Sequence, residues 1–158
     1  MVEVTYVSGN ESLMDKIAPL WEELNRLHLS FSPYFQEYYK TMTFEDRKCS
    51  LQQRTSGGEI RVDLALDDSE NPIGYCVTSI DQWLTGEIES IFVNPLHRGR
   101  GIGTKLIEKA LDWLEVKGTK RNIVAVAVGN EQVYAFYERF GFFPRRTLLE
   151  QKKPAEQK

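Results

Sequence analysis

Three glycines alternate with Arg100 and Ile102 in the stretch NPLHRGRGIGTK, which runs from Asn94 to Lys105. An apolar run, IESIFV, precedes this loop, and a helix-like run, KLIEKALDWLE, follows it. Glycines let a backbone approach a ligand closely, and the free N–H groups at the start of a helix attract anions. Because Arg98 and Arg100 add positive charge, the stretch predicts a loop that binds phosphate.

The spacing of the glycines excludes one common phosphate loop and weakens another. A P-loop requires G-x-x-x-x-G-K-[ST], whereas Gly103 is followed by Thr104 and Lys105 in the opposite order. A dinucleotide-binding fingerprint requires a third glycine where Thr104 stands, and the first acidic residue after the next apolar run is Glu131. A nucleotide-cofactor oxidoreductase is therefore a weaker alternative. A plain turn with solvated arginines is another.

Two motifs in order give a resemblance to a known family. The run from Arg98 to Gly103 matches [RQ]-x-x-G-x-[GA] at every position, and Asn130 precedes a Tyr-x-x-x-Gly-Phe motif from Tyr137 to Phe142. Through these motifs, residues 60–149 resemble the GCN5-related N-acetyltransferases (GNAT). The resemblance implies an α/β fold of the α+β type with a central mixed sheet. It also implies transfer of an acetyl group from the co-substrate acetyl-CoA.

The resemblance further implies where acetyl-CoA binds. The glycine loop would hold the pyrophosphate, and the preceding strand would lie along the pantetheine arm, with a backbone N–H near the thioester carbonyl. The expected cofactor-binding residues are Phe92, Val93, Arg98, Gly99, Arg100, Gly101, Ile102, Gly103, Thr104 and Asn130. Asn130 also stands where it could cap the next helix.

Acetyl transfer to an amine needs a proton acceptor and a proton donor. Glu89 is expected to accept the amine proton directly or through water, because a carboxylate within a covered strand is costly unless it is used or paired. Glu87 lies two residues away on the same face and would raise the pKa of Glu89. By resemblance, Tyr137 is expected to protonate the leaving thiolate. Its helical spacing with Phe136 and Phe140 equally suits a core aromatic.

The acceptor amine is expected over the N-terminal helices and the cleft between the strands at 87–93 and 122–128. His28, Tyr34 and Glu87 are the candidate contacts, because aromatic and acidic groups suit a cation. His28 lies on an apolar helix face, where a structural histidine is the commoner case. The sequence leaves open whether the amine belongs to a small molecule or a peptide. An acyl-CoA-binding regulatory module without turnover is the alternative function.

Periodicity predicts one domain over residues 1–151 and a solvated tail over 152–158. It also predicts the element order β-α-α-β-β-β-α-β-α-β, and the resemblance implies about six to seven strands and about four helices. Strands are expected at 2–7, 59–68, 73–81, 87–93, 122–128 and 142–151, and helices at 13–29, 43–55, 102–114 and 131–140. The strand at 122–128 should be buried on both faces. Pro19 should kink the first helix or shift its start.

Composition narrows the class of protein. The chain has 158 residues, 41% of them hydrophobic, and a net charge of −3, which disfavours a general nucleic-acid binder. Cys49 and Cys76 form no CxxC motif and the two histidines lie far apart, so no metal site is expected. The N-terminus lacks a signal-peptide pattern and no run has the roughly 18 apolar residues of a membrane span. A cytoplasmic protein is expected, and the resemblance allows a homodimer.

Overall fold

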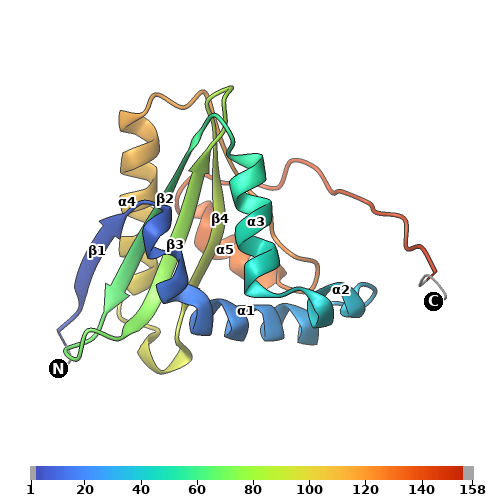
Figure 1. Cartoon of the computed structure of the whole chain (residues 1–158), viewed down its shortest axis with the longest axis horizontal. Helices are drawn as coiled ribbons and strands as arrows, with labels where there is room; N and C mark the ends of the chain where they lie inside the picture. The colour runs from blue at the N-terminus through green and yellow to red at the C-terminus, as the bar shows by residue number, and fades with distance from the viewer. Residues whose placement is uncertain (1–2, 155–158) are drawn as a thin grey trace.

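The computed structural model describes residues 3–154 and places a five-stranded sheet between two layers of helices (Figure 1). The strand order is β1-β2-β3-β4-β5. The strands are β1 (Thr5–Gly9), β2 (Glu59–Leu66), β3 (Pro72–Ile80), β4 (Thr85–Val93) and β5 (Arg121–Val124). Strands β1 to β4 pair antiparallel, whereas β4 and β5 pair parallel. The mixed α/β sheet implied by the resemblance is confirmed.

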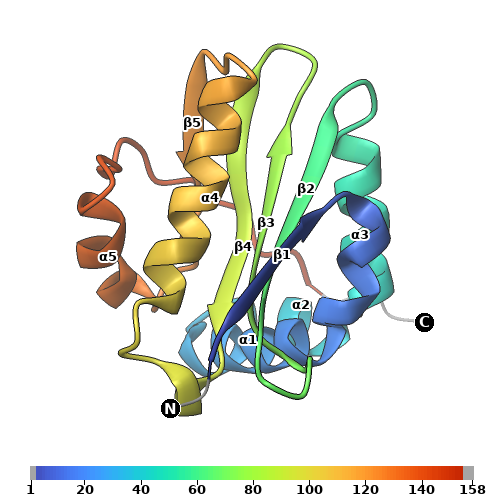
Figure 2. The ribbon, with the colours of Figure 1, turned by 90° about the vertical axis from the view of Figure 1, so that its left-hand side faces the viewer.

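The helices divide between the two faces of the sheet, as Figure 2 shows. One face carries the N-terminal helices and the other carries the two later ones, and short 3-10 helices precede α1, α4 and α5. The α-helices are α1 (Ala18–Phe31), α2 (Gln36–Thr41), α3 (Phe44–Arg54), α4 (Ile102–Val116) and α5 (Tyr134–Glu138). The 3-10 helices are η1 (Glu11–Ile17), η2 (Pro95–His97) and η3 (Glu131–Val133).

Local sequence signals explain where these helices begin. Pro19 stands in the first turn of α1, where no backbone N–H is required, so it shifts the start of the α-helix to Ala18. Residues before it form η1, which Asn10 caps through its side chain. Thr43 and Asp46 form a capping box at the start of α3, each side chain accepting the other's backbone N–H.

Each face of the sheet packs against its own apolar core. On the α1 and α3 face the core includes Leu20, Trp21, Leu24, Leu51, Val62, Leu64, Tyr75, Val77 and Phe92. On the α4 and α5 face it includes Cys76, Ile88, Ile102, Leu106, Ile107, Ala110, Leu114 and Tyr137. The sheet is therefore held from both sides, which fixes β4 between two helix layers.

Several expectations about the elements are wrong. The sheet of the described chain has five strands rather than six or seven, because residues 142–154 form no strand and pair with no described neighbour. The run at 122–128 is a strand only from Arg121 to Val124, and it lies at the sheet edge with no fully buried residue. An additional short helix, α2, follows Pro33. Residues 1–2 of the expected first strand and residues 155–158 of the expected tail lie outside the described residues.

Gly129, in the segment that follows β5, lies in tight contact with Phe31 at the end of α1. Gly129 has φ +95°, and a Cβ there would overlap the carbonyl oxygen of Phe31 and lie 2.7 Å from the Phe31 Cβ. Gly118 has a similar φ of +72° but open space around it. We expect Gly129→Ala to lower the unfolding free energy by about 3 kcal/mol, from backbone strain plus overlap.

Gly118→Ala is the matched control and should cost about 1 kcal/mol, the strain alone. Urea denaturation of both variants measures the difference. Equal losses would show that the contact between Gly129 and Phe31 does not constrain the fold.

Candidate active site

The site begins where two parallel strands separate. β4 and β5 pair in register from Thr85 with Arg121 to Ile88 with Val124, and the pairing ends there. At the next residue the β3–β4 register shifts, because Val77 faces Ser90 and Thr78 faces Ile88. Glu89 therefore has no partner on β3 and forms a β-bulge. Beyond it, β4 keeps β3 as a neighbour but loses β5.

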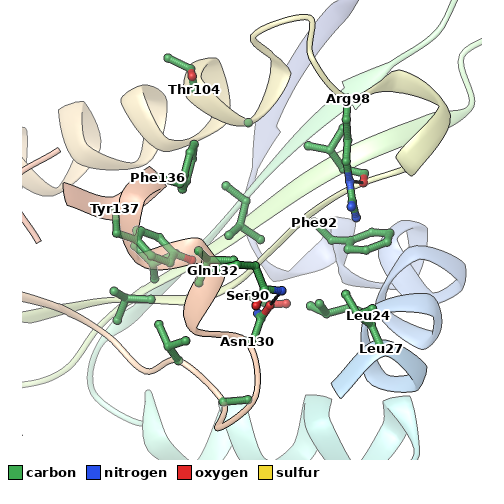
Figure 3. A pocket seen from close by; sticks show the side chains of 18 of the residues that line it. Leu24, Leu27, Ser90, Phe92, Arg98, Thr104, Asn130, Gln132, Phe136 and Tyr137 are labelled. Carbon is green, nitrogen blue, oxygen red and sulfur yellow. Dashed lines mark hydrogen bonds between the residues drawn. The ribbon is translucent and has the colours of Figure 1, made fainter. Parts of the chain in front are cut away.

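A cavity of about 650 Å³ fills the gap between the diverging strands (Figure 3). One wall is the C-terminal half of β4, from Ser90 to Val93, and the other is the segment after β5, from Ala125 to Ala127. The glycine loop and the start of α4 close one end, and α5 covers another side with Phe136 and Tyr137. This volume and these mixed polar and apolar walls suit an elongated small molecule.

The glycine loop presents backbone N–H groups to the cavity. Gly99 and Gly101 both have φ +76°, a conformation that disfavours other residues. Gly101 is the N-cap of α4 and supplies no side chain to the first N–H groups of this helix. These N–H groups, together with the positive end of the helix dipole, are available for an anion. Arg98 also lines the cavity, and its Nε donates to the carbonyl oxygen of Val93 at 2.8 Å.

The structure brings together most of the expected cofactor-binding residues. Those lining the one cavity are Phe92, Val93, Arg98, Gly99, Gly101, Ile102, Gly103, Thr104 and Asn130. Arg100 is exposed and does not line it. The side chain of Asn130 does not cap η3. Its Oδ1 instead accepts from Gln132 Nε2 at 2.6 Å.

Glu89 is clamped by groups from α3 and β3. Its Oε1 accepts from Ser79 Oγ at 2.6 Å and from a guanidinium N–H of Arg54. Its Oε2 lies 3.3 Å from Arg47 Nη2, which also donates to the Glu89 carbonyl oxygen at 3.0 Å. The side chain of Glu89 is only 2% exposed. A buried carboxylate with two guanidinium partners is held in one fixed orientation.

Glu87 lies beside this clamp with a weaker link to it. Its Oε2 is 3.8 Å from Arg54 Nη1, and its side chain is partly buried. Burial, followed by the charge of Glu89, raises the pKa of the Glu87 carboxyl, while Arg54 opposes this. Glu87 does not line the cavity, although its carboxylate, like that of Glu89, lies near Arg54 of α3. The two carboxylates therefore differ: Glu89 is locked at the cavity, and Glu87 is the one whose pKa moves toward neutrality.

Tyr137 both packs in a core and lines the cavity. Its ring lies against Phe136 and Phe142, with centroid distances of 5.3 and 6.0 Å. Burial raises the pKa of the Tyr137 phenol, so its hydroxyl keeps its proton at neutral pH. Figure 3 shows this ring among the side chains that line the cavity, with Gln132 nearby. The two interpretations of Tyr137, core aromatic and cavity residue, are compatible.

Of the residues expected to contact the acceptor amine, His28 lines the cavity and Tyr34 does not. His28 lines the cavity from α1, and its ring meets Tyr39 edge-on at 5.8 Å. Burial and then the charge of Arg47 lower the pKa of His28, which favours the neutral imidazole. Tyr34 lies in the turn between α1 and α2, is 68% exposed and does not line the cavity.

The sequence did not reveal the residues that hold Glu89 in place, or Ser90 in the cavity wall. Arg47 and Arg54 stand seven residues apart on α3, a spacing that puts both on one helix face and could have marked them. Ser79 lies on the neighbouring strand, and no local pattern pairs it with Glu89. Ser90 hydrogen-bonds the buried Tyr75 hydroxyl at 2.7 Å and faces the cavity.

Comparisons with known proteins agree with this fold. The family model described as acetyltransferase (GNAT) family matches residues 21–142. A solved structure of a proposed acetyl transferase from Pyrococcus furiosus is 26% identical, has a TM-score of 0.75, and covers 96% of this chain and 100% of its own. An aminoglycoside N-acetyltransferase solved in complex with CoA has a TM-score of 0.66 at 16% identity, covers 97% of this chain and 96% of its own, and is similar in fold.

Curated relatives match over shorter stretches. An uncharacterised N-acetyltransferase from Methanocaldococcus jannaschii is 38% identical over 77 residues, which is 45% of this chain and 34% of that protein. A peptidyl-lysine N-acetyltransferase from Salmonella typhimurium is 34% identical over 80 residues, 50% of this chain and 48% of that protein. The matches therefore span about a third to a half of these relatives. Because the family model covers most of the chain, the chain belongs to the acetyltransferase (GNAT) family.

We expect Glu89→Gln to destabilise the fold. The substitution leaves two guanidiniums beside an uncharged group, and loss of one partner of a buried pair costs about 3 kcal/mol. The denaturation midpoint of this variant at neutral pH should fall accordingly, while Glu87→Gln provides the neighbouring control.

Glu87→Gln should become more stable relative to wild type as the pH rises, whereas Glu89→Gln should be less stable than wild type at neutral pH. Since the folded-state pKa of Glu87 is raised, its favourable contribution is present below the unfolded pKa and is lost as the pH rises through the folded pKa. The unfolding free energy of Glu87→Gln relative to wild type should therefore increase between about pH 4 and pH 8. Similar losses for both variants at neutral pH would contradict the distinction between them.

Proposed function

We propose that this chain is an N-acetyltransferase that moves the acetyl group of acetyl-CoA to a primary amine by direct attack. The observation that carries the proposal is the single cavity between β4 and the segment after β5. It joins the glycine loop at one end to Tyr137, Asn130 and His28 further in. A ligand with an anionic group at one end and a long uncharged arm would match this order of residues along the cavity.

The residues fit acetyl-CoA as the co-substrate. The open N–H groups of the loop and of the start of α4, with Arg98 close by, suit a pyrophosphate. The edge of β4 from Ser90 to Val93, which has no β5 partner, can hydrogen-bond the amides of the pantetheine arm as an added strand would. In this arrangement the N–H of Val93 is the proposed donor to the thioester carbonyl.

In the proposed reaction, the amine nitrogen attacks the thioester carbon, a C–N bond forms and the C–S bond breaks. Tyr137 gives its proton to the departing thiolate, so that CoA leaves as a thiol. The raised pKa of Tyr137 supports a protonated phenol at the start of each turnover. The amine nitrogen releases one proton to solvent and the Tyr137 phenolate takes one back from solvent, so the protons balance over one turnover.

Glu89 is proposed to act as base through a water molecule, which accepts the amine proton. Arg47 and Arg54 both contact the Glu89 carboxylate and fix its orientation at the cavity. We therefore assign Glu89 the role of polarising and orienting the water, with the proton passing on to solvent.

The acceptor is proposed to carry a primary amine and to enter beside His28. One relative bears the name of a peptidyl-lysine acetyltransferase and one structural neighbour that of an aminoglycoside acetyltransferase. Both names involve amines, one of a peptide and one of a small molecule, so both types belong in the test. In the described chain, no helix is long and apolar enough to cross a membrane.

The test measures thiol release from acetyl-CoA with a panel of amines: amino acids, polyamines, aminoglycosides, and peptides with a free lysine or N-terminus. Tyr137→Phe should lower kcat about a hundredfold with the best amine and leave the KM for acetyl-CoA within about twofold. Tyr134→Phe, in the same helix but outside the cavity, is the matched control and should match wild type. His28→Ala should raise the KM for the amine alone.

Each alternative has its own signature. Saturable binding of acetyl-CoA with no thiol release for any amine would favour a non-catalytic acyl-CoA-binding module. Binding of NAD without binding of acetyl-CoA, measured by calorimetry, would favour an oxidoreductase. A Tyr137→Phe variant with the kcat of wild type would remove the acid role from Tyr137.

A further inference from the structure

Two consecutive side chains at the bulge of β4 lie on the same face of the sheet. Glu89 accepts from Ser79 Oγ at 2.6 Å, and Ser90 Oγ lies 2.7 Å from the hydroxyl oxygen of Tyr75. Tyr75 and Ser79 stand four residues apart on β3, so both point to the face that carries α1 and α3. Consecutive strand residues normally point to opposite faces. The bulge therefore turns both Glu89 and Ser90 toward the side of the cavity that His28 lines from α1.

The hydrogen bond between Ser90 and Tyr75 has one favoured direction. Tyr75 is 0% exposed, and within residues 3–154 its hydroxyl has Ser90 Oγ as its one hydrogen-bond partner. If Ser90 donated, the phenol proton would be buried without an acceptor, which is costly. Burial raises the pKa of the Tyr75 phenol, so the proton stays on its oxygen. The Tyr75 hydroxyl is therefore the donor, and Ser90 Oγ accepts.

This direction leaves the hydroxyl proton of Ser90 for the cavity. A serine hydroxyl has one proton and two lone pairs. Tyr75 occupies one lone pair, and no group in the described part of the chain accepts the proton of Ser90. Ser90 lines the cavity, and Figure 3 shows it among the side chains there. Its hydroxyl is thus a donor that a buried residue holds by the oxygen and that a molecule in the cavity can use.

The neighbouring Glu89 has acceptor capacity left for the same molecule. Its two oxygens accept from Ser79, Arg54 and Arg47, which use three of about four lone-pair positions of a carboxylate. Glu89 lines the same cavity as Ser90. A water molecule between the two side chains would accept from Ser90 and donate to Glu89, and two protein partners are enough to order a water. One lone pair of that water would remain for the proton of an amine.

We propose that Ser90 and Glu89 together hold the water that accepts the amine proton, and that Tyr75 is a positioning residue that fixes the direction of the Ser90 hydroxyl. This role rests on the proposed function and adds the second partner of the water to it. With Glu89 alone the water could rotate about one hydrogen bond, whereas a second bond from Ser90 orients its free lone pair. The water takes a proton from the amine nitrogen as the C–N bond forms and gives one to solvent, so it is regenerated.

The test compares kcat and KM of wild type, Ser90→Ala, Tyr75→Phe and the double variant, with acetyl-CoA and the best amine of the panel. Ser90→Ala should lower kcat about tenfold and Tyr75→Phe about fivefold, and both should leave the KM for acetyl-CoA within about twofold. Because Tyr75 acts only through Ser90, the double variant should have the kcat of Ser90→Ala. Ser90→Thr keeps the hydroxyl and should keep at least about half of the wild-type kcat.

Thr78→Val is the matched control, because it removes another buried hydroxyl of β3 that does not line the cavity. Thr78 is 0% exposed, and its Oγ1 lies 3.7 Å from Cys76 Sγ on the α4 face of the sheet. This variant should have the kcat of wild type. Thermal unfolding of every variant separates a loss of stability from a loss of turnover.

A second measurement needs neither acetyl-CoA nor an amine. Nuclear magnetic resonance should detect the Tyr75 hydroxyl proton of wild type as a slowly exchanging signal, because the group is buried and hydrogen-bonded. The signal should be absent in Tyr75→Phe and should shift in Ser90→Ala. A signal that Ser90→Ala leaves unchanged would overturn the assignment of Tyr75 as the donor.

Three kinetic outcomes would overturn the proposal and leave the proposed function intact, because wild type still turns over in each. They are a Tyr75→Phe variant with the kcat of wild type, a double variant whose loss is the product of the two single losses, and a Ser90→Thr or Thr78→Val variant as slow as Ser90→Ala. A wild-type chain that releases no thiol with any amine would instead overturn the proposed function and, with it, this role of Ser90 and Tyr75.

Discussion

The separation of β4 from β5 after Ile88 and Val124 is the constraint on which the rest of the site depends. Two parallel strands that pair along their whole length leave no room for a ligand between them. Here the pairing stops, and the bulge at Glu89 bends β4 while it remains attached to β3. The backbone from Ser90 to Val93 then lacks a strand neighbour on one side, and a hydrogen-bonding ligand can supply what the sheet does not.

The clamp on Glu89 stands at the point of separation, and this position explains its cost. Burying a carboxylate is unfavourable unless charged hydrogen bonds replace its water. Arg47, Arg54 and Ser79 supply them, and Arg47 also bonds the backbone carbonyl of the bulge. The clamp therefore ties α3 to the bulge as well as neutralising the charge. Structure and chemistry share one group here, because the residue proposed to orient a water is also the one that stabilises the bend.

Local motifs led to most of the predicted residues that line the cavity. The glycine loop, the helix after it, Asn130 and Tyr137 could be found because their spacing along the chain is also their arrangement in space. Glu89 was found because a charge within an apolar strand is unusual. Arg47, Arg54 and Ser79 were missed because their contacts with Glu89 span between 10 and 42 residues of sequence.

The errors in the predicted sheet have a different cause. The segments at 122–128 and 142–151 have an apolar, strand-like composition. Such a composition favours pairing in a sheet but does not identify the neighbouring strand. β5 stops where β4 turns away from it, and residues 142–154 pair with no strand among the described residues. The acceptor is the part of the function least accessible to sequence, because residues such as His28 and Tyr34 reach the site, or miss it, through the packing of α1 and α2.

Hydrogen exchange with and without acetyl-CoA tests most directly whether the gap between the strands is the binding site. If the co-substrate lies along β4, the amides of residues 90–93 and of the loop at 99–104 should exchange more slowly on binding, while those of β1 should not change. Saturable binding of acetyl-CoA that leaves the amides of 90–93 and 99–104 unaffected would contradict a site between β4 and β5.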